Sequence, residues 1–490
     1  MKEVLVGITP KKAKKFLNLA MGNRHGLIAG ATGTGKTVTL QSLAERFSKA
    51  GISIFAADVK GDLSGIALPG GNNPKIEKIL TPIEAKPIPW AGCPTIFWDL
   101  YGEKGHPLRT TLTEMGPLLL GRLLNANVIQ QGIIDIAFKA ADDEGLLLLD
   151  LKDFTALLNW MSDNAETLRR QYGNVSKSSI GAIQRGLLSL SEAGGNQFFG
   201  EPALQLRDLI KLDESGKGYI NILDATKLIN DPRLYSTFLL WLLSELFEQL
   251  PELGEVDKPK LIFFFDEAHL LFNSAPKILL DKIEQMVRLI RSKGVGVYFV
   301  TQTPLDVPET ILGQLGNRIQ HALRAFTPKD QKAVKTAAQT FRQNPAVDSE
   351  KLIMELGVGE ALVSFLDADG IPSMVEEVQI VPPLSRIGTI TAEERTTLIK
   401  HSPLYGVYDT TLERESAYEI ISKRTLARQQ EQHIPTENND NTEPTKSSRS
   451  PKPRVSTTQV LIKNTTKVLT SRIGQQIMRG ILGSIFGGKK

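Results

Sequence analysis

The first candidate for chemistry is a glycine-rich segment, Gly30-Ala-Thr-Gly-Thr-Gly-Lys-Thr37, which matches the phosphate-binding pattern GxxxxGK[ST]. An apolar run precedes it and a helical run follows it, which makes a chance glycine-rich turn the weaker interpretation. The glycines permit a tight loop whose backbone N–H groups face phosphate oxygens, and the helix adds its positive N-terminal end. We expect Lys36 to reach the β- and γ-phosphates and Thr37 to hold Mg²⁺. The predicted nucleotide-binding residues of this loop are Gly30, Ala31, Thr32, Gly33, Thr34, Gly35, Lys36, Thr37 and Val38.

Two carboxylates at the end of a second apolar run are the next candidates. Asp266 and Glu267 directly follow Leu261–Phe265. A buried strand of this kind exposes its acidic end at the carboxyl edge of the sheet, where open α/β sheets bind ligands. Asp266 suits the hydration shell of Mg²⁺, and Glu267 suits activation of an attacking water. The pair alone could be a solvated turn, but phosphoryl transfer needs both a phosphate loop and a metal-positioning acid. We expect His269 to pack or cap near this site rather than act as a base.

One amide and two arginines complete the catalytic candidates. Gln302 follows the apolar run VYFVT and could hydrogen-bond the γ-phosphate or the lytic water, although a strand-end glutamine in solvent is the plain alternative. Arg288 and Arg291 lie in a predicted helix between the Asp266-Glu267 strand and the Gln302 strand. An arginine supplied by a neighbouring subunit can stabilise charge on the transferring phosphoryl group. A surface role is an equally open interpretation for both arginines.

The elements that must position these residues follow an α/β pattern. Short apolar runs typical of strands alternate with longer helical stretches. Most of the runs are apolar on both faces, which is typical of a mainly parallel sheet covered by helices. The predicted strands are His25–Gly30, Ile52–Val59, Pro94–Leu100, Gly218–Ala225, Lys260–Ala268, Gly296–Thr303 and Arg318–Phe326. We therefore predict an α/β P-loop NTPase core in two parts, residues 1–108 and 215–428, the second of which carries the acidic pair and Gln302.

Three further segments lie outside that pattern. Leucine-rich helical periodicity predicts a helical subdomain, residues 109–214, inserted into the sheet domain. Residues 429–458 are poor in apolar side chains and rich in Asn, Thr, Ser and Pro, which predicts a disordered linker. Residues 459–490 regain apolar spacing with only positive charges, which predicts a basic amphipathic helix that docks on another surface. A frayed solubilising tail is the alternative for this last segment.

The charge distribution bears on the partner. The chain has a net charge of +4, from 58 Lys and Arg and 54 Asp and Glu. The residues after Glu443 include ten Lys and Arg and no acid, so residues 1–443 carry 48 basic and 54 acidic side chains. Nucleic-acid binding by that larger part would therefore need a local basic channel.

The sequence also indicates a cellular location. Its apolar runs are shorter than the ~18–20 residues that cross a bilayer. The single cysteine, Cys93, can form no internal disulfide, and the N-terminus shows no secretory signal. We therefore expect a cytoplasmic protein without a transmembrane segment.

Several quoted segments point to one family. They are Asn23–Gln41, Ala57–Gly65, Phe263–Phe272, Ile290–Gln331 and the basic, glycine-containing C-terminus. Together they resemble the HerA-like branch of the HerA/FtsK superfamily of P-loop motor ATPases, and most closely the bacterial YjgR-type HerA-like helicases. The resemblance covers the chain from about residue 5 to about residue 425.

This resemblance implies a RecA-like core that forms a homo-oligomeric ring, with a hexamer as the expected form. Such a ring hydrolyses ATP with Mg²⁺ at subunit interfaces and moves duplex DNA through its channel. By the same resemblance, Gln302 is the γ-phosphate sensor and Arg291 is the arginine finger that acts in trans. The resemblance also implies that Arg24 lies near the phosphates and that Asp58 lies near the site.

Two functions from different classes follow. The leading expectation is an ATP-hydrolysing ring motor that translocates along or unwinds duplex DNA. The alternative is an ATP-driven switch or assembly factor that acts on protein partners, with the basic tail as its docking element. The ATPase rate with and without duplex DNA discriminates between them.

Overall fold

A computed structural model of the chain describes residues 2–71, 73–84, 87–173, 175–273 and 277–432. Its strands are β1 (Glu3–Ile8), β2 (Lys14–Asn18), β3 (Gly26–Ala29), β4 (Ser53–Asp58), β5 (Thr95–Asp99), β6 (His106–Pro107), β7 (Ile220–Asp224), β8 (Leu261–Phe265), β9 (Val295–Thr301), β10 (Asn317–Gln320), β11 (Glu360–Ser364) and β12 (Glu376–Ile380). Within the described ranges these strands form one 12-stranded sheet in the order β2-β1-β12-β11-β10-β3-β9-β8-β4-β7-β5-β6.

The central strands pair in parallel, from β10 through β3, β9, β8, β4 and β7 to β5. Each of the seven predicted strands overlaps one of them, with β9 and β10 each starting one residue earlier than predicted, and the predicted α/β class with a mainly parallel sheet is confirmed. The sequence did not predict the antiparallel extension in which β11, β12, β1 and β2 continue the sheet beyond β10. Strands such as β12 are only partly buried, so they lack the continuous apolar run that identifies the central ones.

The helices are α1 (Lys36–Lys49), α2 (Pro74–Leu80), α3 (Leu112–Leu123), α4 (Val128–Glu144), α5 (Leu151–Asp163), α6 (Ala165–Tyr172), α7 (Lys177–Leu190), α8 (Asn196–Phe198), α9 (Pro232–Gln249), α10 (His269–Phe272), α11 (Lys277–Ile290), α12 (Glu309–Leu312), α13 (Pro328–Gln339), α14 (Ser349–Glu355), α15 (Ala392–Lys400) and α16 (Ala417–Gln432). In the described part of the chain, no helix is both long enough and apolar enough to cross a membrane.

Successive residues of each central strand pack into different cores on the two faces of the sheet. In β8, Ile262 and Phe264 share one core with side chains of α1. Phe263 and Phe265 share the other core with α9, α11 and the helices that follow β6. Because both faces of the strand are buried, its polar continuation must emerge at the end of the strand, where ligands of such sheets bind.

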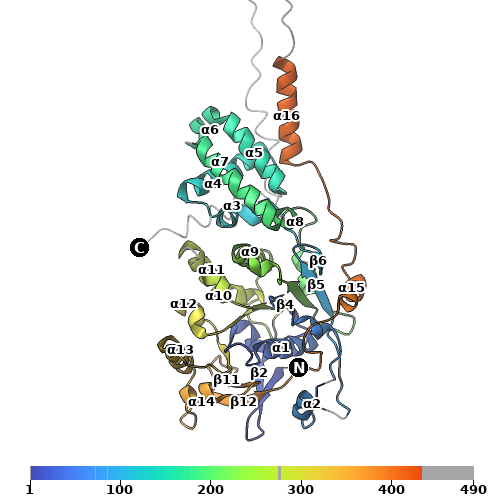
Figure 1. Cartoon of the computed structure of the whole chain (residues 1–490), viewed down its shortest axis with the longest axis vertical. Coiled ribbons are helices and arrows are strands. Elements are labelled where there is room, and N and C mark those ends of the chain that lie inside the picture. The colour runs from blue at the N-terminus through green and yellow to red at the C-terminus, as the bar shows by residue number, and fades with distance from the viewer. Residues whose placement is uncertain (1, 72, 85–86, 174, 274–276, 433–490) are drawn as a thin grey trace, which may run out of the picture.

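The predicted insert, residues 109–214, holds helices α3 to α8, which Figure 1 shows as a separate lobe above the sheet. Helix α5 begins with a capping box, in which Asp150 is the N-cap residue and Asp153 lies at the third helical position. This cap fixes the start of the helix at Leu151.

Helix α16 packs on the insert, where the backbone N–H of Tyr418 donates to Asp153 Oδ1 at 2.9 Å. Figure 1 shows α16 alongside this lobe, far from the sheet. The helix continues to Gln432, so the predicted linker does not begin at Gln429. The buried apolar residues of α16, Ala417 and Ile421, lie in its N-terminal part. The rest of the predicted linker and the predicted tail helix, residues 459–490, lie outside the described residues.

Candidate functional site

The glycine-rich loop connects β3 to α1 and requires its glycines. Gly30, Gly33 and Gly35 have φ angles of 155°, 78° and 113°, a region that glycine enters without steric cost. At Gly30 a Cβ atom would also lie 2.5 Å from the Cβ of His321. The loop therefore turns tightly between the strand and the N-terminal end of α1, whose first N–H groups have no acceptor within the helix.

Lys36 lies folded against this loop. Its Nζ donates to the carbonyl of Gly30 at 2.6 Å and to the carbonyl of Ala31 at 3.0 Å. Burial and the nearby charge of Lys60 lower the pKa of the Lys36 ammonium, and the carboxylates of Glu267 and Asp266 oppose this shift. The ammonium thus lies in the field of the acidic pair that follows β8.

The other predicted loop residues differ in how they face the surface. Thr32 and Gly33 are exposed at the tip, while Thr37 and Val38 are partly buried at the start of α1. Thr34 is buried, and its hydroxyl donates to the carbonyl of Ala31 at 2.7 Å. The Thr34 side chain therefore holds the loop conformation and leaves its backbone to face a ligand.

Behind the loop lies a histidine that the sequence did not single out. His321 follows β10, and its ring nitrogens lie 2.8 Å from Thr39 Oγ1 and 2.8 Å from the carbonyl oxygen of Glu360. Burial lowers the pKa of His321 to about 4, so the ring is neutral at pH 7. Only the parallel pairing of β10 with β3 brings this residue to the loop, and no local pattern could have found it.

The acidic pair emerges where β8 ends. Asp266 Oδ1 accepts the backbone N–H of Glu267 at 2.9 Å, and the hydroxyl of Tyr235 donates to the Asp266 carbonyl at 2.8 Å. Burial, reinforced by the charge of Glu267, raises the pKa of Asp266 to about 7. Such a carboxylate is costly to ionise until a cation compensates it.

Asp58 ends the neighbouring strand β4. Its carboxylate accepts the N–H groups of Gly61 at 2.7 Å and Leu63 at 3.0 Å. Burial, with smaller contributions from Asp62 and Asp266, raises its pKa to about 7. Asp58 therefore lies close enough to Asp266 to interact with it electrostatically, while its hydrogen bonds order the loop that carries Lys60.

Glu267 has a left-handed backbone, with φ of 49°, an uncommon conformation for a residue with a Cβ. Its Oε1 lies 3.5 Å from Lys60 Nζ, and its Oε2 lies 3.4 Å from His269 Nδ1. Oε2 is buried and accepts no hydrogen bond from the described residues. The carboxylate is therefore held between two basic side chains with one oxygen free to accept a proton. Lys60 was overlooked as a site residue, although its position just after a buried strand was a usable signal.

Gln302 follows β9, the strand between β3 and β8. The carbonyl of Thr301 accepts the N–H of Gly30 at 3.3 Å, and the carbonyl of Val300 accepts the N–H of Ala268 at 3.0 Å. The Gln302 side chain is exposed. The sheet therefore places Gln302 at the same edge as the phosphate loop and the acidic pair, between the two.

The oxygen donors at this edge fit Mg²⁺. This ion takes one or two protein oxygens and completes its shell with water and phosphate oxygens. Thr37 lies in the first turn of α1, and Asp266 uses only Oδ1 to accept the N–H of Glu267. Hard oxygen donors flanking a phosphate loop are therefore present.

The arginines lie at the opposite edge of the sheet. Arg24 precedes β3, and Arg291 begins a 3₁₀ turn that precedes β9. The two line a cavity of about 340 Å³ together with Arg288, Arg318 and Arg342. Because an extended strand separates its two ends, β3 places Arg24 at the sheet edge opposite its own phosphate loop, and the expected position of Arg24 near the phosphates stays a prediction.

Arg291 is exposed at that edge, and its carbonyl accepts the side-chain amide of Asn23 at 3.1 Å. Arg288 forms an ion pair with Glu284 one turn earlier in α11, with a separation of 2.6 Å. Arg291 therefore lies at the sheet edge opposite its own phosphate loop, near Arg24 and Arg288.

A comparison with known proteins identifies relatives with the same core. The family described as Helicase HerA-like C-terminal matches residues 3–490. The DNA double-strand break repair helicase HerA of Saccharolobus solfataricus is 24% identical over 358 residues, which cover 72% of this chain and 64% of that relative. The chain thus spans less than two thirds of the length of this relative.

Two solved structures share the fold. VirB4 of Thermoanaerobacter pseudethanolicus matches with a TM-score of 0.51 at 13% identity, over 80% of this chain and 98% of that one. The plasmid coupling protein TrwB in complex with ADP and Mg²⁺ matches with a TM-score of 0.50 at 14% identity, over 79% of this chain and 90% of that one. The expected P-loop NTPase core fold is confirmed.

Proposed function

The chain belongs to the Helicase HerA-like C-terminal family, and from this membership we propose that it is a Mg²⁺-dependent ATPase motor that acts on duplex DNA. One observation carries the proposal. The phosphate loop, Gln302 and the Asp266-Glu267 pair follow three adjacent parallel strands, β3, β9 and β8. A phosphate cradle, a polar sensor and a metal-positioning acid in this order are what hydrolysis of a nucleotide γ-phosphate requires.

Different residues of the loop bind the phosphates and the metal ion. The free N–H groups at the start of α1 bind phosphate oxygens, and Lys36 exchanges its two carbonyl acceptors for the β- and γ-phosphates. Thr37 and Asp266 hold Mg²⁺, which neutralises charge on the phosphates. The ammonium of Lys36 needs no large movement, because its present acceptors belong to the loop that surrounds the nucleotide.

Glu267 and Gln302 act on the attacking water. Glu267 Oε2 is buried without a hydrogen bond among the described residues, so it is available to accept the proton of that water. Gln302 orients the water or contacts the γ-phosphate from the neighbouring strand. The two residues before Gln302 accept hydrogen bonds from the loop, at Gly30, and from Ala268, the residue after the acidic pair. A displacement at the γ-phosphate can therefore be transmitted to β9.

The motor is proposed to be a homo-oligomeric ring, with a hexamer as its form. Arg291 lies at the sheet edge opposite the phosphate loop, which is where a head-to-tail neighbour would present its nucleotide. Duplex DNA is the proposed substrate because the relative named above is a DNA double-strand break repair helicase. A cytoplasmic location stays a prediction.

ATP hydrolysis measured with and without duplex DNA tests the proposal. We expect Mg²⁺-dependent hydrolysis that duplex DNA stimulates, and its loss in a Lys36→Ala variant. Particle symmetry in the presence of an ATP analogue and DNA would show a ring around the duplex. Absence of hydrolysis in an assembled ring would overturn the ATPase assignment. An ATP hydrolysis rate that duplex DNA does not change, together with no DNA binding, would overturn the assignment of DNA as the substrate.

A further inference from the structure

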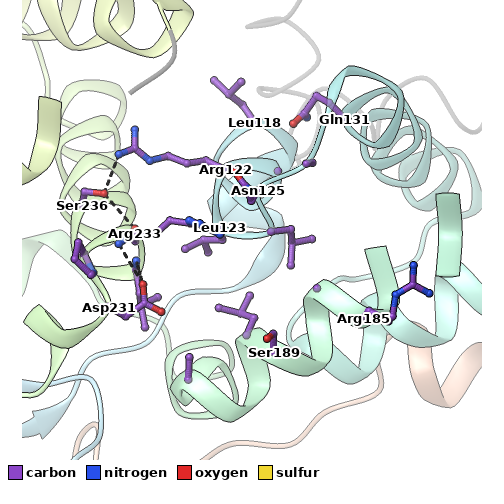
Figure 2. A pocket seen from close by; sticks show the side chains of 18 of the residues that line it. Leu118, Arg122, Leu123, Asn125, Gln131, Arg185, Ser189, Asp231, Arg233 and Ser236 are labelled. Carbon is purple, nitrogen blue, oxygen red and sulfur yellow. Dashed lines mark hydrogen bonds between the residues drawn. The ribbon is translucent and has the colours of Figure 1, made fainter. Parts of the chain in front are cut away.

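A second cavity lies between the helical insert and the sheet domain. It measures about 1080 Å³, and its walls come from the end of α3, from α7, and from the starts of α9 and α10. Figure 2 shows Arg122 and Ser236 on one side of it, with Arg185 and Ser189 on α7 across from them. This volume is in the range that holds a nucleotide-sized ligand.

The cavity carries excess positive charge. Three arginines line it, Arg122, Arg185 and Arg233, and none forms an ion pair with a carboxylate in the described ranges. The acidic residue in the lining, Asp231, is committed to the N-terminus of α9, where its carboxylate accepts the N–H groups of Arg233 and Leu234 at 3.1 and 3.0 Å. The lining therefore carries three positive charges against one negative charge, and that carboxylate forms no ion pair with any of the three arginines among the described residues.

Arg122 shows the consequence of this imbalance. Its Nη2 donates to Ser236 Oγ at 2.8 Å, but its Nη1 is buried and has no acceptor among the described residues. Burial and the nearby charge of Arg233 lower the pKa of the Arg122 guanidinium to about 10, which leaves it charged at pH 7. A buried, unsatisfied and charged donor beside a like charge is unfavourable until an anion approaches it.

The other lining groups indicate which anion fits. Ser189, Ser236, Asn125 and Gln131 add hydroxyl and amide groups around the arginines. The N-terminal end of the 18-residue helix α9 also borders the cavity, with its partial positive charge. A guanidinium fork matches the paired oxygens of a phosphate, and hydroxyl and amide groups supply the remaining donors.

We propose that this cavity binds a phosphoryl group, carried either by a free nucleotide or by the backbone of a nucleic acid, with Arg122 and Arg233 as its main ligands. A small rotation of the Arg122 guanidinium brings Nη1 to the anion while Nη2 keeps Ser236. Leu270 and Asn273, on and just after α10, border the same cavity. Since α10 begins two residues after Glu267, a ligand here contacts the helix that closely follows the proposed catalytic acid.

Binding of thymidine 3′,5′-bisphosphate to the full chain, measured by calorimetry, tests this site. The titration is run in the wild-type background and in a Lys36→Ala background, so that phosphate binding by the loop is weakened in one arm. We expect binding that persists in the Lys36→Ala background and that weakens about 10-fold or more when Arg122→Gln or Arg233→Gln is added, as loss of a charged hydrogen bond predicts. Arg170→Gln is the matched control, because Arg170 is an exposed arginine of the same insert, on α6 and outside the lining. Its affinity should equal that of the wild type.

A single-stranded decanucleotide of thymidine, titrated in parallel, distinguishes the two sources. Binding of both probes with loss in Arg122→Gln assigns the nucleic-acid backbone, whereas binding of the bisphosphate alone assigns a free nucleotide. Equal affinity of wild type, Arg122→Gln and Arg233→Gln, or binding of neither probe by the wild type, would overturn the proposal. If the phosphate loop binds no nucleotide, the two backgrounds give the same affinity and the comparison of the arginine variants still reports on this cavity, so failure of the proposed ATPase and failure of this site are distinguishable.

Discussion

Glu267 Oε1 lies 3.5 Å from the ammonium nitrogen of Lys60. Lys60 comes from the loop after β4, while Glu267 follows β8, and the parallel pairing of these strands brings them together. The same ammonium lowers the pKa of Lys36. One lysine outside the glycine-rich loop therefore influences both the phosphate-binding lysine and the proposed catalytic carboxylate.

Replacement of Lys60 tests that influence. We expect Lys60→Met to bind ATP with nearly wild-type affinity but to lower kcat about 10-fold, a typical effect of displacing a catalytic acid or base. Lys104→Met is a matched control, because the Lys104 side chain has the same exposed fraction, 43%, and pairs with a different strand-end acid, Asp224. A wild-type kcat in Lys60→Met would contradict the role assigned to this contact.

Glu267→Gln should separate binding from hydrolysis. The amide keeps the size of the side chain but cannot accept the proton of the attacking water, so hydrolysis should fall by roughly 10²–10⁴. ATP should still bind, because the loop residues and Asp266 are unchanged. Equilibrium binding of a fluorescent ATP analogue and steady-state phosphate release measure the two effects. Wild-type turnover by this variant would remove Glu267 from the proposed mechanism.

Arg291 should act on a neighbouring subunit. Arg291→Ala rings should lose most activity, by about 10³ or more as for other trans arginines. Mixing Arg291→Ala subunits with Glu267→Gln subunits should restore part of it, because some interfaces then receive one intact residue from each partner. Arg288→Ala is the comparison, since Arg288 is already paired with Glu284. Verified mixed rings with no recovered activity would contradict a role in trans.

Asp266 should make stability depend on pH when Mg²⁺ is removed. Its folded-state pKa, about 7, is raised above the ordinary value of 3.8. The folded chain therefore keeps this proton to higher pH than the unfolded chain. The contribution of this proton to the free energy of unfolding is fully present below about pH 4 and is lost as the pH rises through 7. We measure the change in Tm between pH 6 and pH 8.5 in EDTA for the wild type and for Asp266→Asn. We expect the Tm of the wild type to fall by roughly 2–4 °C more than that of the variant.

The amide of that variant can still accept the N–H of Glu267 through its oxygen, so the turn should be preserved. Addition of Mg²⁺ with ADP should reduce the pH dependence of the wild type, because the cation compensates the ionised carboxylate. Identical pH dependence of Tm in both proteins would show that Asp266 titrates as in the unfolded chain.

The sequence by itself determined the local chemistry. The glycines at 30, 33 and 35, Lys36 and Thr37 form a contiguous segment whose φ requirements and charge are set within a few residues. The acidic pair was likewise predictable, because a continuous apolar run can only be buried, and the residues that follow it must emerge at its end. These features need no knowledge of which strands are neighbours.

Strand order and the distances between remote segments were decided only by the tertiary structure. The insertion of β9 between β3 and β8 places Gln302 beside both partners, and the neighbour relation of β10 and β3 places His321 behind the loop. The same strand, β3, places Arg24 at the sheet edge opposite the glycine-rich loop of its own chain. Arg122 and Ser236 meet at 2.8 Å although 114 residues separate them in the chain. Periodicity reports which face of an element is buried but not what covers it, because pairing and packing are set by the free energy of the whole fold.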